Sequence, residues 1–174
     1  MQIKEIQLDD NLVDIEINVE EKQTGSVNAG LALGTVDGFS VMAGLKERNF
    51  GGTGRSVNAL LNTSDGRNQY TLETTDRILY RDNVDLSYAL NYVEEDFSSA
   101  SSYKVNTVSV GTGVTYDINS KFRHNINLDY LIKDYMITNN STVSSTIVNS
   151  EGENVSFLLK NNIYYSSLNS RYQP

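Results

Sequence analysis

The segment Val84-Asp85-Leu86-Ser87-Tyr88-Ala89-Leu90-Asn91-Tyr92 contains one of the clearest structural patterns in the sequence. Large apolar side chains occupy every second position, and small or polar ones stand between them. Successive side chains of a β-strand point to opposite faces of the sheet, so this alternation predicts a strand with one apolar and one polar face.

The same period of two recurs along the rest of the chain. Counting the first stretch, we expect eight strands after residue 24, and most approach the ~9–11 residues with which a tilted strand crosses a bilayer. The other seven segments are 27–33, 39–46, 56–62, 70–73, 107–117, 125–133 and 155–165.

The composition agrees with an antiparallel all-β chain and excludes several functions. The 174 residues include 12 glycines and 11 tyrosines but a single proline, which suits strands joined by polar turns. A net charge of −8 argues against a nucleic-acid partner, because phosphates need a basic surface. With no cysteine, the chain has no disulfide, thiol nucleophile or thiolate metal site.

Alternation alone leaves open whether the apolar face meets lipid or a second sheet. A membrane barrel is favoured over a soluble sandwich or lipocalin-like barrel by the connections, since the longest lie at one end of the strands, as extracellular loops do. That end has connections 35–37, 64–68, 95–102 and 138–154; the other has 49–54, 75–83 and 119–122. We expect two aromatic girdles, from Tyr92, Phe97 and Tyr103 at one end and Tyr80, Tyr116 and Phe122 at the other.

The two ends of the sequence suggest a piece of a longer exported protein. Met1-Gln2-Ile3-Lys4-Glu5 lacks the basic and apolar regions of a secretory signal, which an exported chain should have. We therefore expect further sequence upstream, and more beyond the abrupt end at Pro174.

Several motifs, in order along the chain, resemble the BamA family of outer-membrane assembly proteins. The acidic strand 13–21 leading into Thr24-Gly25-Ser26 is similar to the junction between the family's last POTRA domain and its first barrel strand. Segments 30–35, 37–40, 82–87 and 168–174 continue the likeness, although Asp76-Arg77-Ile78-Leu79-Tyr80 departs from the family's proline-aromatic pair.

The likeness is strongest at Lys46–Arg55, which resembles the family's first periplasmic turn. Its glycines have a physical reason, because a tight turn needs positive φ angles that strain other residues. The turn motif consists of Asn49, Phe50, Gly51, Gly52, Thr53 and Gly54.

The resemblance implies an architecture, a location and a function. Residues 1–23 would end a POTRA domain and its linker, and residues 24–174 would form the N-terminal half of a sixteen-stranded transmembrane β-barrel in the bacterial outer membrane. Without cofactor or metal, such a protein inserts other barrels into that membrane, with nascent outer-membrane proteins, assembly lipoproteins and the lipid bilayer as partners.

The residues that carry this function, by the resemblance, form the first barrel strand. Its glycines predict weak pairing, and an open strand edge presents backbone groups that template an incoming strand. The predicted pairing edge is Ser26, Val27, Asn28, Ala29, Gly30, Leu31, Ala32 and Leu33. The alternatives are a TamA-like or two-partner secretion barrel of the same architecture, and a free-standing eight-stranded barrel or soluble sandwich without an assembly role.

No set of side chains indicates catalysis or metal binding. His124, the only histidine, has no evident partner in sequence and is expected at a strand end. The acidic residues 9, 10, 14, 16, 20 and 21 lack the glycine-punctuated spacing of a calcium loop. Asp85, Asp117 and Asp129 should pair with Lys133 and Lys160 on the polar face.

Overall fold

The computed structural model describes residues 2–9, 12–18, 23–35, 38–77, 83–139 and 142–167. Two antiparallel sheets make up this part of the chain. The first is a hairpin of β1 (Gln2–Asp9) and β2 (Leu12–Asn18), so the expected terminal POTRA strand has a partner that the sequence pattern did not reveal.

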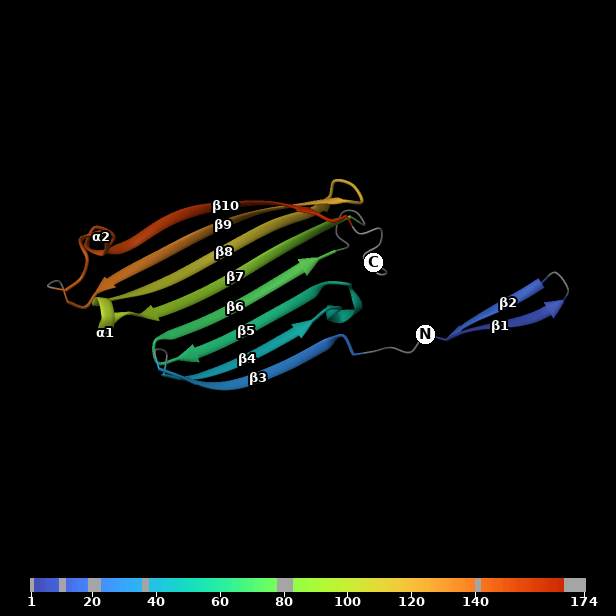
Figure 1. The fold of residues 1–174 in the computed structure, drawn as a ribbon, viewed down its shortest axis with the longest axis horizontal. Coiled ribbons are helices and arrows are strands. Elements are labelled where there is room, and N and C mark those ends of the chain that lie inside the picture. Colours follow the sequence, from blue (N-terminus) through green and yellow to red (C-terminus); the bar gives the residue numbers. More distant parts are fainter. Residues whose placement is uncertain are drawn as a thin grey trace.

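The second sheet contains the eight strands predicted after residue 24, each paired with its neighbour in the chain (Figure 1). Two single-turn helices, α1 (Ser98–Ser101) and α2 (Ser145–Val148), lie between its later strands. The strands are β3 (Gly25–Gly34), β4 (Gly38–Glu47), β5 (Ser56–Ser64), β6 (Arg67–Asp76), β7 (Val84–Asp96), β8 (Tyr103–Asp117), β9 (Phe122–Ile137) and β10 (Gly152–Tyr165).

The strand lengths divide the sheet into two halves. Strands β3 to β6 have 9 or 10 residues, close to the predicted span, and β6 is longer than its alternating segment 70–73. Strands β7 to β10 have 13 to 16 residues. The prediction was too short there because one end of each strand continues past the alternating apolar residues, and in β9 both ends do.

The register places the predicted apolar residues of all eight strands on one face. Across the middle of the sheet, each residue lies opposite the next in a continuous row. From β3 to β10 this row contains Val27, Leu45, Ala59, Leu72, Leu90, Val110, Tyr130 and Phe157. The opposite face carries the polar residues, as the alternation predicted.

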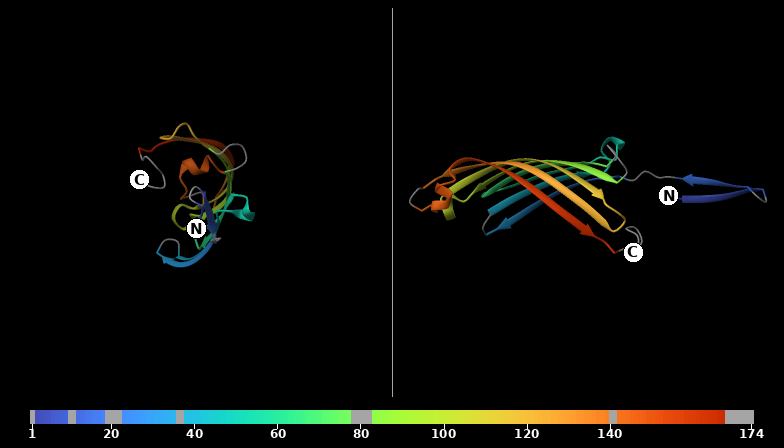
Figure 2. Two further views of the ribbon diagram at one scale, coloured as in Figure 1. Left: turned by 90° about the vertical axis from the view of Figure 1, so that its right-hand side faces the viewer. Right: turned by 90° about the horizontal axis from the view of Figure 1, so that it is seen from above.

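The sheet bends into an open arch, as the end-on view in Figure 2 shows. On the central strands the apolar side chains are about half exposed, such as Leu90 at 52% and Val110 at 50%, while the polar-face neighbours Ala89 and Ser109 are less exposed. The apolar face is therefore the convex one, and the polar side chains line the concave side. This is the arrangement of a barrel wall between lipid and a wet lumen.

The sheet has almost no hydrophobic core. Val105 is the only buried apolar residue among those described, and the accessible surface is 13100 Å². A compact soluble monomer of 19.4 kDa would expose about 8,500 Å². The apolar face therefore needs a nonaqueous environment, which contradicts a soluble sandwich.

Polar residues border the apolar band on the convex face, and the border shows the tilt of the strands. We call the end with connections 35–37, 65–66, 97–102 and 138–151 the outer end and the opposite one the inner end. At the outer end, a row of mutually opposite residues is polar from β5 to β10, but in β4 the same row contains the apolar Val41. At the inner end Glu47 closes the band in β4, although its row reaches Leu159 in β10. The band thus runs obliquely to the rows, as tilted strands require. The outer polar row consists of Thr63, Asn68, Glu94, Asn106, Asp134 and Glu153.

The expected difference in connection length holds only for the long-stranded half. Connections 97–102 and 138–151 are the long ones at the outer end, but 48–55 at the inner end exceeds 35–37 and 65–66. None of the helices in the described segments is long and apolar enough to cross a membrane. Residues 78–82 and 168–174, where the family turn patterns and Tyr80 fall, lie outside the described residues.

Candidate strand-pairing site

The predicted pairing edge is an unbroken strand at one margin of the sheet. Residues 26–33 lie within β3 and pair with β4 without a bulge, from Gly25 opposite Glu47 to Gly34 opposite Gly38. Among the described residues, β4 is the only strand bonded to β3. The convex side chains Val27, Leu31 and Leu33 are 73–84% exposed, since they have a neighbouring strand on one side only.

Small side chains dominate the contact between β3 and β4. Ala29 lies opposite Ala43, and Gly30 lies opposite Met42. A Cβ added at Gly30 would meet only the Met42 methyl carbon, 3.7 Å away. Cross-strand side-chain pairs supply about 0.2–1 kcal/mol each relative to a pair of alanines, so the middle of this seam gains little beyond its backbone hydrogen bonds. On either side of it the apolar pairs Val27–Leu45, Leu31–Val41 and Leu33–Phe39 lie opposite each other on the convex face.

A carboxylate at the inner end holds the start of β3. Glu47 lies opposite Gly25, and a Cβ added at Gly25 would lie 2.5 Å from the Glu47 Oε2 atom. The carboxylate accepts a hydrogen bond from Thr24 and a 2.8 Å bond from the Asn49 backbone N–H. These bonds lower the pKa of Glu47 below its usual value, Thr24 contributing most.

The turn motif 49–54 is tightly hydrogen-bonded, and its glycines have the positive φ angles that the sequence predicted. Gly51, Gly52 and Gly54 have φ values of 62°, 74° and 75°. The Asn49 Oδ1 atom accepts a 2.6 Å bond from the Gly54 N–H, and the Thr53 hydroxyl donates a 2.7 Å bond to the Phe50 carbonyl. Next to the turn, Arg55 pairs with the buried Asp76 at 2.7 Å.

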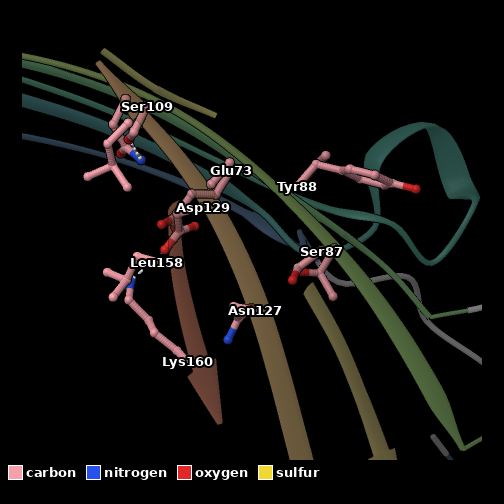
Figure 3. A pocket seen from close by; sticks show the side chains of 13 residues that line it. Glu73, Ser87, Tyr88, Ser109, Asn127, Asp129, Leu158 and Lys160 are labelled. Atoms are coloured by element: carbon pink, nitrogen blue, oxygen red, sulfur yellow. Dashed lines mark hydrogen bonds and ion pairs between the residues drawn. The ribbon is translucent and has the colours of Figure 1, made fainter. Parts of the chain in front are cut away.

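The concave face contains a polar hollow of about 450 Å³ crossed by strands β6 to β10 (Figure 3). Asp129 accepts a 2.8 Å ion pair from Lys160, which confirms one of the predicted pairings. Its carboxylate lies over Gly111, where an added Cβ would clash with the Oδ1 atom. Glycine at this point is what lets the acidic side chain lie along the wall.

Two other predictions for polar and aromatic residues were wrong. Asp117 pairs with Arg123, at 2.8 Å across the β8–β9 turn, rather than with a lysine. Tyr103 lies on the concave side, where it contacts Phe97 and Tyr135, so it is not part of a lipid-facing girdle. Of the expected inner girdle, Tyr116 and Phe122 lie on the convex face, where Phe122 packs on Tyr165 with ring centroids 5.1 Å apart, and Tyr80 lies outside the described residues.

The structure also reveals a polar cluster that the sequence did not predict. His124 lies on the convex face, its Nδ1 atom 2.7 Å from the Tyr116 hydroxyl and its Nε2 atom 2.6 Å from Asn161 Oδ1. These partners are 8 and 37 residues away, so only the strand register brings them together. No group of three or more His, Asp or Glu side chains in the described segments could hold a metal ion.

Comparison with known proteins identifies the class to which this arched sheet belongs. Residues 49–174 match the family model of the Omp85 superfamily domain, and the chain belongs to that superfamily. Its strands are therefore part of an integral outer-membrane β-barrel.

Within the superfamily, the chain is similar to BamA. It is 27% identical over 124 residues to the outer membrane protein assembly factor BamA of Buchnera aphidicola, a match that covers 70% of this chain and 20% of the relative. The structure of Haemophilus ducreyi BamA lacking POTRA domains 1–3 has the same fold, with a TM-score of 0.66 and 20% identity over 99% of this chain and 36% of that one. The chain thus spans about one fifth of the length of its curated relative.

Proposed function

We propose that this chain provides the N-terminal half of the barrel of an outer-membrane protein assembly factor, with β3 as the strand that templates substrate proteins. The proposal rests on the likeness to a relative named as an assembly factor. Residues 1–23 would then end a periplasmic POTRA domain, and residues 24–174 would begin the barrel.

The observation that carries the mechanism is the weak side-chain contact between β3 and its neighbour. β3 is the first strand of the sheet, and at its middle Gly30 and the Ala29–Ala43 pair contribute few side-chain contacts. In a closed barrel β3 would lie between β4 and the closing strand of the full-length protein. With equally few side-chain contacts to the closing strand, β3 would separate from it readily. Its free N–H and C=O groups would then pair with an incoming strand.

The bilayer drives such an exchange. Unpaired backbone groups cost several kcal/mol each in hydrocarbon, so an opened edge and an unfolded substrate strand both gain by pairing. No cofactor or nucleotide is needed for this step. The partners would be nascent outer-membrane proteins, assembly lipoproteins and the bilayer itself.

Cysteine cross-linking in the full-length protein tests the proposal. Single cysteines at Ser26, Asn28 and Ala32, which share the concave face of β3, should cross-link to the terminal strand of a substrate during assembly. Reactivity should alternate with a period of two, because neighbouring positions point to the other face. Cysteines at Ser87 and Ala89 are the matched controls, since β7 is bonded on both sides.

A disulfide between β3 and the closing strand supplies the decisive result. The locked protein should remain folded but lose assembly activity, and reduction should restore it. Normal assembly by the locked form would reduce this half-barrel to a passive pore or scaffold.

A further inference from the structure

The convex face carries one hydrogen-bonded polar cluster inside the inner part of the apolar band. It consists of Tyr116, His124 and Asn161, on three neighbouring strands. Leu159 precedes Asn161 on the same face of β10, and Ile163 follows it, so an amide interrupts an apolar run. Polar side chains that face hydrocarbon are expensive and therefore indicate a specific role.

The hydrogen bonds fix which atoms of the cluster remain available. Asn161 Oδ1 can only accept, so His124 Nε2 carries the ring proton and donates to it. The Nδ1 atom shares its hydrogen bond with the Tyr116 hydroxyl. Both N–H groups of the exposed Asn161 amide are left without an acceptor among the described residues and face the bilayer.

Toward the membrane centre, the side chains near the cluster change from cationic to polar to apolar, the order in which a phospholipid has its phosphate, ester groups and acyl chains. Lys121 in the β8–β9 turn is exposed and has no acidic partner in the described part of the chain. The aromatic pair Phe122–Tyr165 comes next, then the level of His124, then that of Asn161. Leu128 and Leu159, opposite each other, continue the apolar surface toward the membrane centre.

We propose that this patch binds a glycerophospholipid of the inner leaflet. Lys121 attracts the phosphate, the Asn161 amide donates to an ester carbonyl, and the acyl chains lie on Leu128 and Leu159. From Lys121 to the level of Asn161 the chain advances five residues, about 17 Å along the strand and about 12 Å in depth at a 45° tilt. The flexible lysine stem shortens this span, which then matches the distance from phosphate to ester groups.

His124 and Tyr116 act as positioning residues for this contact. Because its Oδ1 atom accepts the hydrogen bond from the imidazole N–H, Asn161 is held with its own N–H groups directed away from the ring. Tyr116 fixes the ring through Nδ1 and also forms an edge-on ring contact with it, at a centroid distance of 5.2 Å. The role rests on the convex face being the lipid-facing one, not on the proposed assembly function.

Native mass spectrometry of the full-length protein tests the site. The detergent-purified, delipidated protein is titrated with an ester-linked phosphatidylethanolamine and, in parallel, with its diether analogue, which lacks the carbonyls. The wild type should retain one ester lipid with about fivefold higher affinity than the diether lipid, the effect of one hydrogen bond. Asn161→Leu should abolish this preference, and Lys121→Gln should weaken both lipids about equally.

The controls separate a binding role from a structural one. Thr112→Val removes another polar side chain of the convex face, outside the cluster, and should leave the preference unchanged. Tyr116→Phe keeps the ring but loses the hydroxyl, and it should reduce the preference for the ester lipid partly. It provides the test if Asn161→Leu does not fold. Equal affinity for the two lipids in the wild type, or an unchanged preference in both variants, would overturn the proposal. The affinities for the two lipids do not depend on assembly activity. The lipid site can therefore be confirmed or contradicted independently of the templating mechanism.

Discussion

The two marginal strands of the sheet are attached to it in very different ways. β3 joins β4 over 10 residues, with Gly and Ala at the middle of the seam, no aromatic pair comparable to that of the other margin, and Glu47 over its first residue. β10 joins β9 over 14 residues, and its contacts include Phe157 on Tyr130 at a centroid distance of 5.1 Å. The β9–β10 seam also contains the Lys160–Asp129 ion pair and the His124–Asn161 hydrogen bond.

The side chains of the two seams indicate which marginal strand is held less firmly. Backbone ladders are alike in every strand pair, so side chains decide which seam separates first. The β9–β10 seam has a longer ladder and larger side-chain contacts, whereas the β3–β4 seam has a shorter ladder and small side chains. In the proposed exchange β3 stays bonded to β4 and separates from the closing strand, where the small side chains of Ala29 and Gly30 would again supply few contacts.

The comparison depends first on both seams having the same lipid-facing side. In the full-length barrel, Leu159→Lys on the convex face should cost about 2–4 kcal/mol of unfolding free energy near the membrane midplane. Leu158→Lys, one residue away on the concave face, should cost much less, since Asp129 lies directly opposite. Denaturant titration in lipid vesicles measures both. Equal penalties would contradict the assignment of the faces.

A double-mutant cycle measures the side-chain contribution of each seam. Replacing Phe157 and Tyr130 by alanine, singly and together, should give a coupling free energy of about 0.5–1.5 kcal/mol. The same cycle at Leu31 and Val41, opposite each other in the β3–β4 seam, should give less, within the usual ~0.2–1 kcal/mol. Unfolding titrations of the wild type and the six variants decide the point. A larger coupling at Leu31–Val41 would reverse the comparison.

How much of this could be predicted from the sequence follows the range of each interaction. Alternation with a period of two is local, so the eight strands and both faces could be predicted. The ends of β7 to β10 could not, because residues such as Asp96, Lys104 and Asp134 continue the strands beyond the apolar band. There, backbone pairing extends the strand without an apolar pattern.

The candidate site shows the same limit. The turn motif could be predicted because its positive φ angles require glycines at fixed places. The Asp129–Lys160 pair followed from both residues lying on the polar face, but the choice of Arg123 by Asp117 depends on the position of the β8–β9 turn. The His124 cluster was missed because its three residues are neighbours only once the register is known.

A larger side chain at Gly30 should strengthen the β3–β4 seam. Gly30→Val adds a strand-forming side chain where the nearest atom is 3.7 Å away, so β3 should gain about 0.5–1 kcal/mol. Hydrogen exchange of the β3 amides should slow about two- to fivefold. Gly44→Val is the matched control, since its Cβ would lie 2.6 Å from Asn28 Oδ1 and force that side chain to move. Equal slowing by both variants would mean that packing at Gly30 is not what weakens the seam.

The smallest expected effect is a pH dependence at the start of β3. Glu47 lies inward of the apolar band, and its hydrogen bonds to Thr24 and the Asn49 N–H lower its pKa below 4.5. A lowered carboxyl pKa means that the charged form is favoured in the folded state. Its contribution is therefore complete above about pH 4.5 and is lost as the pH falls through the lower folded value.

Acidification should therefore fray the first residues of β3 more than the inner end of β10, where the pairs from Asn161–Ile126 to Tyr165–Phe122 contain no carboxylate. In the full-length protein, a cysteine at Ser26 should become more reactive toward a pH-insensitive dithiopyridine reagent between pH 5 and pH 3, relative to one at Asn162. Glu47→Gln keeps an acceptor oxygen but cannot titrate, so it should remove the pH dependence at Ser26. If the pH dependence at Ser26 remained in Glu47→Gln, another group would be responsible for it. The two seams would then differ only in their side-chain packing.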